Sequence, residues 1–370
     1  MWVYRSDISQ ANDVLPGSVV EVSDEHGKFV GTAFYSTASQ IAVRLISREK
    51  VGDLNALLRE RIRAAVGYRE RFVRNSDAYR VIFSEADFLP GLIVDRYNDL
   101  LSFQVLTQAM DAEAVRETIL SELTEQLHPA AIAERVDAKI RELEQLPERQ
   151  SGLVRGNQAS TVFAMNGVKF HYDVSEGQKT GAFLDQRENY AAAASYARGQ
   201  ALDVFCYHGG FALHLAKAGC KVTGIDSSRP ALEIADRNAT LNGQGIEWIE
   251  GNAFDVLRDY ARDSAKYDLI VLDPPAFAKS KRDVETALRG YKELNLRALK
   301  MLKPEGILVT CSCSYHVSAA DLLATVAEAS RDAHRELRLL ENRAQSKDHP
   351  ILTGVPETGY LKSMIFYVSR

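Results

Sequence analysis

The C-terminal half of the chain alternates between short apolar runs and longer amphipathic stretches. The apolar runs are typical of buried strands, which we expect over residues 201–206, 221–226, 246–251, 267–273 and 306–312. The stretches that follow them have the spacing of amphipathic helices, which we expect over residues 211–219, 230–243, 253–263, 283–302 and 318–333. Repeated strand–helix units of this length predict an α/β fold with a parallel, doubly wound sheet.

The N-terminal half has strand-like runs that are separated by turns. Residues 18–35 and 40–47 have a β-type pattern, and the polar segment Asp24–Lys28 predicts a hairpin turn. These strands, with an amphipathic helix over 53–72, suit a small β-barrel closed by that helix. The next zone mixes strands with a helix and suggests an α+β module. We therefore expect three domains, over residues 1–68, 69–170 and 171–370.

Composition indicates a globular protein that does not span a membrane. The chain has 370 residues, 46% of them hydrophobic, which suits two or three domains. No apolar run approaches the ~20 residues that cross a bilayer, and the start carries Arg5 and Asp7 without a signal peptide. We expect a cytoplasmic protein. The four cysteines are too few for a disulfide scaffold, and their spacing makes a poor zinc site, so no metal is expected.

One stretch is basic although the net charge of the chain is −5. Between Arg44 and Arg80 the chain carries ten basic residues and five acidic ones. Such a cluster could follow the phosphates of a nucleic acid. On charge alone, a solvated helix face is the more common origin of this pattern.

The residues that follow the expected strands indicate a nucleoside cofactor, because ligands of doubly wound sheets bind beyond the carboxyl ends of the strands. Gly209 and Gly210 lie between the first strand and its helix, where glycine lets the backbone approach a ligand. Asp226 ends the next strand, at the spacing of an acid that binds a ribose diol. The G-x-G-x-x-G pattern of dinucleotide sites is absent, which favours S-adenosylmethionine. The alternative is a tight turn with a helix-capping Asp.

Two further segments fit this cofactor. Asn252 and Ala253, after the third strand, are placed to meet the adenine edge. The segment Ser175–Asn189 is dense in glycine and polar residues and is expected to form a lid over the methionine end; an ordinary surface loop is the alternative. The residues expected at the cofactor are Phe183, Asp185, Arg187, Asp203, Phe205, Tyr207, Gly209, Gly210, Asp226, Ser227, Asn252, Ala253 and Asp273.

The segment "LDPPAF" after the fourth strand suits a planar base. Asp273 lies at the strand tip, and two prolines restrict the backbone behind it. A rigid carboxylate with a stacking aromatic ring can accept hydrogen bonds from a base and pack on its face. Such turns are common in enzymes that methylate the amino groups of bases. The residues expected to contact the substrate are Pro274, Phe277, Lys279 and Lys179, and Asp273 is expected to be catalytic.

The segment "TCSCSY" indicates a different reaction on a base, methylation of carbon. Cytosine C5 becomes nucleophilic when a thiolate adds to C6, which is covalent catalysis. A free Cys needs a cationic or hydrogen-bonded setting to form the thiolate, and Lys179, Arg187 or Lys279 could supply the charge. Buried structural residues are the alternative for Cys311 and Cys313. We expect the nucleophile to be one of the two and prefer Cys313, which is nearer the strand tip.

Taken in order, these stretches resemble the ribosomal RNA large subunit methyltransferase I family, which makes 5-methylcytosine in 23S ribosomal RNA. The resemblance covers essentially the whole chain. It is carried by "SEADFLPGLIVDRYND", "GQKTGAFLDQREN", "DVFCYHGGF", "LDPPAFAKSK", "TCSCSY" and "DHPILTGVPETGYLK".

The resemblance implies an N-terminal RNA-binding PUA domain, a central α+β domain and a C-terminal Rossmann-like methyltransferase domain. It also implies a cofactor pocket at Asp226 and Asn252 and a nucleophilic cysteine in "TCSCSY". Ribosomal RNA would be the partner, and a homodimer is one option for the assembly. The chain departs from the family where it begins at Met1, so a PUA domain without its first strand is expected. It also has His208 where Thr is common and Asn252 where Asp is common.

Three functional hypotheses follow. The leading one is an S-adenosylmethionine-dependent RNA cytosine-C5 methyltransferase. The second uses the same fold to methylate guanine at N2 or N7, with Asp273 recognising the base and both cysteines structural. The third is a non-catalytic RNA-binding protein that keeps the fold.

Overall fold

The computed structural model describes residues 1–11, 13–175, 182–262 and 265–369. Their contacts divide the chain into two compact units. Unit 1 comprises Met1–Phe163, Tyr172–Ala182 and Lys347–Thr358, and unit 2 comprises Ala164–His171, Phe183–Ser346 and Gly359–Arg370. The chain therefore leaves each unit and returns to it. The expected domain boundaries at residues 68 and 170 remain a prediction.

Unit 1 begins with an antiparallel sheet in the order β1-β4-β3-β2. The predicted hairpin is confirmed: Asp24 Oδ1 accepts hydrogen bonds from the backbone N–H groups of His26 and Lys28, at 3.0 and 2.9 Å. The short β1, which pairs with β4, was not predicted. The bounds are β1 Trp2–Tyr4, η1 Arg5–Asp7, β2 Val19–Ser23, β3 Phe29–Tyr35 and β4 Ile41–Ser47.

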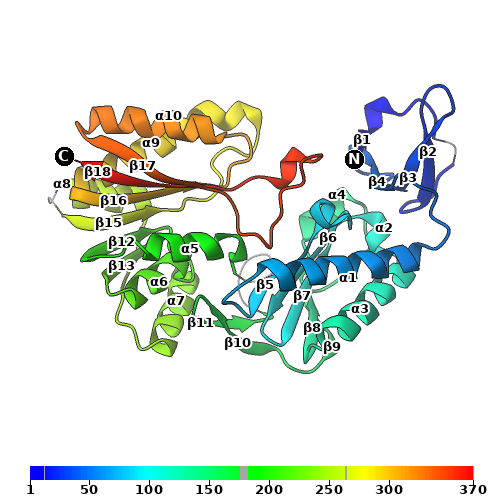
Figure 1. The fold of residues 1–370 in the computed structure, drawn as a ribbon, viewed down its shortest axis with the longest axis horizontal. Helices are drawn as coiled ribbons and strands as arrows, with labels where there is room; N and C mark the ends of the chain where they lie inside the picture. Colours follow the sequence, from blue (N-terminus) through cyan, green and yellow to red (C-terminus); the bar gives the residue numbers. More distant parts are fainter. Residues whose placement is uncertain (12, 176–181, 263–264, 370) are drawn as a thin grey trace. The chain divides into compact units, whose positions relative to one another are not determined.

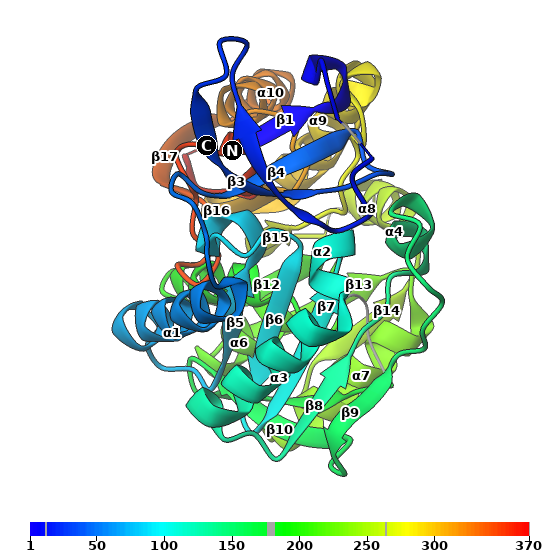
Figure 2. The same cartoon turned by 90° about the vertical axis from the view of Figure 1, so that its right-hand side faces the viewer.

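The rest of unit 1 is built on a five-stranded sheet in the order β5-β6-β7-β8-β9. Asp53 caps the long helix α1, because its Oδ1 accepts from the N–H of Ala56 at 3.0 Å. Figure 2 shows α1 and α3 lying side by side against this sheet. The bounds are α1 Leu54–Phe72, β5 Ala78–Phe83, η2 Ser84–Asp87, β6 Leu92–Tyr97, β7 Leu100–Val105, α2 Gln108–Asp111, α3 Glu113–Leu127, β8 Ala131–Glu134, α4 Ala138–Leu143 and β9 Gly152–Gly156.

Many residues of the basic stretch Arg44–Arg80 take part in ion pairs within unit 1. Arg59 and Arg63 both contact the buried Glu122, at 2.9 and 2.6 Å. Arg80 pairs with the buried Asp95 at 2.8 Å. In the same way Arg44 contacts Glu85 and Glu144, and Arg69 pairs with Asp87. The stretch therefore supplies internal structure, and fewer of its charges face solvent than the sequence suggests.

Unit 2 has a seven-stranded sheet in the order β14-β13-β12-β15-β16-β18-β17. The predicted strands pair in parallel, which confirms the doubly wound fold. The antiparallel β18 and β17 at one edge were not predicted. The bounds are β12 Gln200–Val204, β13 Lys221–Asp226, β14 Glu247–Glu250, β15 Tyr267–Leu272, β16 Leu302–Ser312, β17 Glu336–Arg343 and β18 Lys362–Ser369.

Helices cover both faces of this sheet (Figure 1). Helices α9 and α10 lie on one face, and α5, α6 and α7 lie on the other. Their bounds are α5 Arg187–Ala194, α6 Gly210–Lys217, α7 Arg229–Leu241, α8 Ala253–Arg262, α9 Val284–Met301 and α10 Ala319–Asp332; the remaining elements are the hairpin of β10 Ser160–Met165 and β11 Val168–Asp173, with η3 Leu184–Gln186, η4 Lys281–Asp283 and η5 Pro356–Thr358. No helix among the described residues is long and apolar enough to cross a bilayer.

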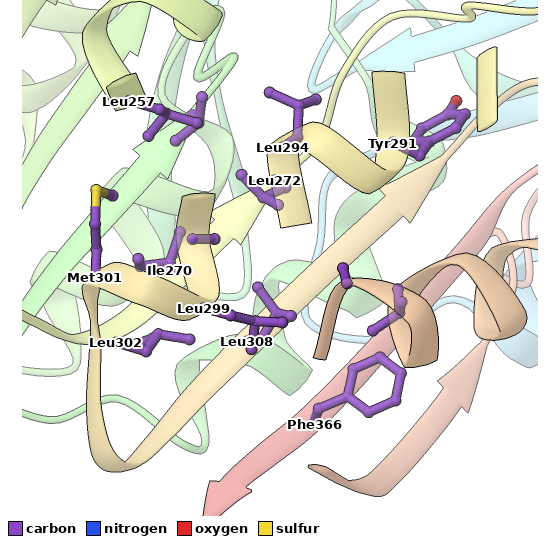
Figure 3. Close-up of a cluster of buried hydrophobic side chains, with 14 of the residues drawn as sticks. Leu257, Ile270, Leu272, Tyr291, Leu294, Leu299, Met301, Leu302, Leu308 and Phe366 are labelled. Atoms are coloured by element: carbon purple, nitrogen blue, oxygen red, sulfur yellow. The ribbon is translucent and has the colours of Figure 1, made fainter. Parts of the chain in front are cut away.

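The main core of unit 2 lies between the sheet and helices α8, α9 and α10 (Figure 3). Ile270 and Leu272 of β15 point to this face because alternate side chains of a strand share one side. They meet Leu294 and Leu299 of α9, all at 1% exposure or less. Burial of each such side chain stabilises the fold by about 1.5–3 kcal/mol, so this core holds the strand ends in place.

Candidate functional site

Parallel pairing brings the carboxyl ends of the central strands to one edge of the sheet. Val204 of β12 lies opposite Ile225 of β13 and Leu272 of β15. Leu272 in turn lies opposite Thr310 of β16. The predicted site residues in the loops after these strands are therefore neighbours, and all of them that are described belong to unit 2.

The turn from β12 into α6 has an unusual backbone. Phe205 and Tyr207 have φ of 67° and 49°, in the left-handed region that non-glycine residues rarely adopt. Gly209 has φ 83°. At Gly210, an added Cβ would lie 2.4 Å from the ring of Tyr190. Backbone strain of this kind persists where the surrounding structure enforces it and is common at ligand sites, so the turn is consistent with the predicted cofactor loop.

Asp226 fastens this turn from the neighbouring strand. Its Oδ2 accepts from the N–H of Tyr207 at 3.0 Å, and its Oδ1 accepts from the N–H of Ser228 at 2.9 Å. The cap of α7 is Ser228, whose Oγ accepts from the N–H of Ala231 at 3.3 Å. The alternative that Asp226 caps the helix is therefore not what the structure shows. The carboxylate is half-buried at the strand end.

Several carboxyl groups gather at the site, and their surroundings oppose ionisation. Burial, with a smaller contribution from the neighbouring Asp273 and Asp226, raises the pKa of Asp203 to about 8 against the opposing effect of the N–H of Ala212. The Oδ1 atoms of Asp203 and Asp185 are buried and have no hydrogen-bond partner among the described residues. Unpartnered buried polar atoms are common where a ligand, water or ion binds. S-adenosylmethionine carries a sulfonium and an ammonium group, so the residues present fit this cofactor.

Asp273 is held at the tip of β15 by a residue that the sequence analysis missed. Gln186 Nε2 donates to both carboxylate oxygens of Asp273, at 3.0 Å each. Gln186 Oε1 accepts from Asn189 Nδ2 at 2.7 Å, which fixes its orientation. Burial raises the pKa of Asp273 to about 7, and the charge of Asp185 adds to the shift. Gln186 lies in the motif "LDQREN", but nothing in its spacing distinguished it from the neighbouring polar residues.

The two cysteines have different environments. Cys311 lies within β16 and is fully buried, and its Sγ donates to Ser363 Oγ at 3.3 Å. Burial raises the pKa of the Cys311 thiol well above its ordinary value. Cys313 follows the last residue of β16 and is partly exposed. Its Sγ lies 3.9 Å from the carbonyl oxygen of Pro274 in the "LDPPAF" turn.

A buried hydroxyl network holds the loop that carries Cys313. Ser312 Oγ donates to Tyr291 Oη at 2.9 Å, and Tyr291 Oη lies 3.0 Å from Ser314 Oγ. Ser314 Oγ also accepts from the N–H of Ala278 at 3.2 Å. The residues on both sides of Cys313 are thus tied to helix α9 and to the segment after the "LDPPAF" turn, which sets the position of the thiol.

The three cations that the sequence suggested for stabilising the thiolate differ in exposure and in whether the structure describes them. Arg187 is buried, with Nη2 3.7 Å from Glu188, and Lys279 is exposed. Lys179 lies outside the described residues, as does most of the glycine-rich part of the predicted lid. A fourth cation, Lys362 of β18, interacts electrostatically with Cys313. Sequence reasoning missed it because β18 was not recognised as a neighbour of β16.

Several of the remaining predicted residues contact other residues of the protein near the strand ends. The rings of Phe183 and Tyr207 meet edge to face at 4.9 Å. Asn252 Oδ1 accepts from the N–H of Phe254 at 3.0 Å at the start of α8, whose first residue is the buried Ala253. The Phe277 ring packs on Tyr291 at 4.9 Å, and Ser227 is exposed. Their roles in binding remain predictions.

Comparisons with known proteins agree with this site. A family model of S-adenosylmethionine-dependent methyltransferases matches residues 86–366, and a PUA-like domain model matches residues 1–48. The ribosomal RNA large subunit methyltransferase I of Tolumonas auensis is 40% identical over 98% of this chain and 94% of its own length. The enzyme of the same name from Shewanella denitrificans is 38% identical, again over 98% of this chain and 94% of its own length.

Solved structures share the fold. The methyltransferase SMU.776 complexed with SAH has a TM-score of 0.84 at 20% identity, covering 99% of this chain and 95% of its own. A methyltransferase from Streptococcus mutans has a TM-score of 0.83 at 19% identity, with the same coverage. The predicted fold and the predicted cofactor, S-adenosylmethionine, are confirmed. The chain belongs to the S-adenosylmethionine-dependent methyltransferases, within the family of ribosomal RNA large subunit methyltransferase I.

Proposed function

We propose that this protein methylates C5 of a cytosine in large-subunit ribosomal RNA, with Cys313 as the nucleophile. The RNA substrate is supported by the two relatives at 38–40% identity, which are large-subunit ribosomal RNA methyltransferases. The choice of the carbon atom is supported by the site itself. A partly exposed thiol lies 3.9 Å from the carbonyl of Pro274, in the turn that begins with Asp273.

The contrast between the two cysteines carries the proposal. A nucleophile must reach the ring of the base and must ionise at moderate pH. Cys311 is enclosed in β16, and its burial opposes ionisation. Cys313 lies beyond the strand end, where part of its surface is exposed. Cys313 is therefore the better candidate, and Cys311 fits the structural role that buried cysteines commonly have.

The reaction would proceed by addition of the thiolate, methyl transfer and elimination. The thiolate of Cys313 forms a bond to C6, and the electrons of the C5–C6 double bond make C5 nucleophilic. Bound S-adenosylmethionine would supply the methyl group that C5 takes up, leaving S-adenosylhomocysteine. A base then removes the C5 proton, the double bond re-forms and the thiolate leaves. Asp273 and the Pro274 carbonyl would accept hydrogen bonds from the N4 amino group and so orient the ring.

The proposal is tested by replacing each cysteine separately. Cys313→Ala should lower the rate of methylation of large-subunit ribosomal RNA by at least about a thousandfold, because it removes the nucleophile. Cys311→Ala is the matched control and should retain most of the activity once folding is confirmed by circular dichroism. The product is identified by mass spectrometry of nuclease-digested RNA, which reports the base and the methylated atom.

Trapping gives a second, direct test. RNA that contains 5-fluorocytosine should form a permanent adduct with the wild-type protein, because fluorine at C5 blocks the step that releases the thiolate. The adduct should be absent with Cys313→Ala. Methylation of guanine at N2 or N7 predicts the opposite result, with no adduct and activity that survives the loss of Cys313. That outcome would exclude the C5 mechanism.

A further inference from the structure

Lys362 is a half-buried lysine whose ammonium group is fixed next to the loop of Cys313. Its Nζ donates to the carbonyl oxygen of Ser314 at 2.6 Å and to that of Tyr360 at 2.8 Å. In the sheet, Lys362 is the register partner of Ser312, the last residue of β16 before Cys313. Two carbonyl acceptors and the strand pairing therefore hold this cation in one place, beside the loop that carries the candidate nucleophile.

We propose that Lys362 is a positioning residue for Cys313: its ammonium group, fixed on the carbonyls of Ser314 and Tyr360, stabilises the thiolate that the methylation of cytosine requires. This inference rests on the proposed function. A thiolate forms more readily next to a cation, a metal or a helix N-terminus. Carboxylates at the site, Asp273 among them, oppose a further anion, so a nearby positive charge favours the thiolate.

The electrostatics around the pair agree with this role. Burial lowers the pKa of Lys362 to about 8, while Cys313 and then Asp321 act in the opposite direction and favour the ammonium form. Cys311 and Tyr291 are two further titratable groups that interact with Cys313. Burial raises the pKa of both, so both are neutral near pH 7. Among the described residues, Lys362 is a cation whose charge acts on Cys313.

A purely structural role for Lys362 makes a different prediction. If the ammonium group only ties the Ser314 carbonyl to β18, its loss should loosen the loop and leave the ionisation of Cys313 unchanged. If it stabilises the thiolate, the pH at which Cys313 becomes reactive must change. The ionisation of the thiol is therefore the quantity to measure, and it can be measured without RNA or cofactor.

The experiment follows alkylation of Cys313 by iodoacetamide across pH 5–10 in the full-length protein, with the modified peptide quantified by mass spectrometry. Lys362→Met should move the midpoint of reactivity upward by about one pH unit or more and slow alkylation near pH 7 about tenfold. Lys362→Arg keeps the charge and should restore most of the reactivity. Lys300→Met, an exposed lysine of α9, is the matched control and should behave as wild type.

An unchanged midpoint in Lys362→Met would overturn the proposal, as would equal effects of Lys362→Met and Lys362→Arg. Thermal unfolding of each variant separates an altered fold from altered ionisation, and Lys362→Arg keeps the test decisive if Lys362→Met folds poorly. The adduct experiment distinguishes the two proposals. If the wild-type protein methylates RNA but gives no 5-fluorocytosine adduct, the C5 mechanism fails. If the adduct forms and the alkylation midpoint does not move, only the role of Lys362 fails.

Discussion

Single residues at the strand ends have pKa values that their side chains rarely have in water. Burial and the charge of neighbouring carboxylates raise the pKa of Asp273 to about 7 and that of Asp203 to about 8. Each carboxyl group therefore binds a proton more tightly in the folded protein than in the unfolded chain. A cationic cofactor would reverse part of this effect, because positive charge next to a carboxyl group favours its ionised form.

The pH dependence of stability tests the state of Asp203. A raised pKa in the folded state favours folding at low pH, and this contribution is lost as the pH rises from about 4 toward about 8. Asp203→Asn keeps an oxygen to accept from Ala212 and has no charge to bury. Relative to wild type, the variant should gain at least about 1 kcal/mol between pH 5 and pH 8 in urea unfolding without cofactor. A pH-independent difference would contradict the assignment.

A variant of Asp273 tests whether this residue acts on the base or on the cofactor. Asp273→Ala removes the acceptor that we propose for the amino group of the base, so kcat should fall by about a hundredfold or more. Calorimetry should show that the affinity for S-adenosylmethionine changes much less. A loss of cofactor affinity as large as the loss of turnover would contradict this division of the site.

At the scale of elements, the turn from β12 into α6 depends on close packing with α5. Gly210 begins α6 and leaves no room for a Cβ next to Tyr190. The strained Phe205 and Tyr207 are held by the pairing of β12 with β13 and by Asp226. Pairing between elements also sets the position of Lys362, because the antiparallel pairing of β18 with β16 brings it to the end of β16.

Gly210→Ala tests this packing. The new methyl group would lie 2.4 Å from the Tyr190 ring, so the unfolding free energy should fall by about 1–3 kcal/mol, and cofactor affinity should fall with it. Gly67→Ala is the matched control. Gly67 lies within the exposed face of α1 with no atom within 4 Å of an added Cβ, so alanine there should stabilise the helix by up to about 1 kcal/mol. Thermal and urea unfolding measure both.

At the scale of the whole molecule, segments distant in sequence complete each unit. Residues 347–358 lie between β17 and β18 in the chain, yet they belong to unit 1. Asp348 is fully buried there: its Oδ2 accepts from the N–H of Arg80, and its carbonyl accepts from Arg69 Nη2, both at 2.8 Å. This attachment is built from polar contacts that a sequence pattern does not reveal.

Asp348→Ala should destabilise unit 1 by about 1–3 kcal/mol, because the buried N–H of Arg80 loses its acceptor. Asp348→Asn retains an acceptor and should cost less. Urea unfolding measures the loss of stability, and hydrogen exchange of the β5 amides shows whether the loss is local. Equal stability of the alanine variant and wild type would show that the attachment does not contribute.

Most elements of unit 2 could be predicted from the sequence because parallel strands, buried on both faces, form continuous apolar runs. The edge strand β17, "ELRLLENR", mixes charged and apolar residues and has no such run, so it was missed. The residues at the strand tips could also be listed in advance, since doubly wound sheets bind ligands there.

The sequence alone determined the fold class, the cofactor and the set of candidate residues, because these depend on local patterns and on the order of strands and helices. Only the tertiary structure decided that Cys311 is enclosed and Cys313 is partly exposed. It also decided that Lys362 interacts with Cys313 and that Gln186 holds Asp273. Burial, charge proximity and hydrogen bonding between residues tens of positions apart depend on how the elements pack, and no local pattern contains that information.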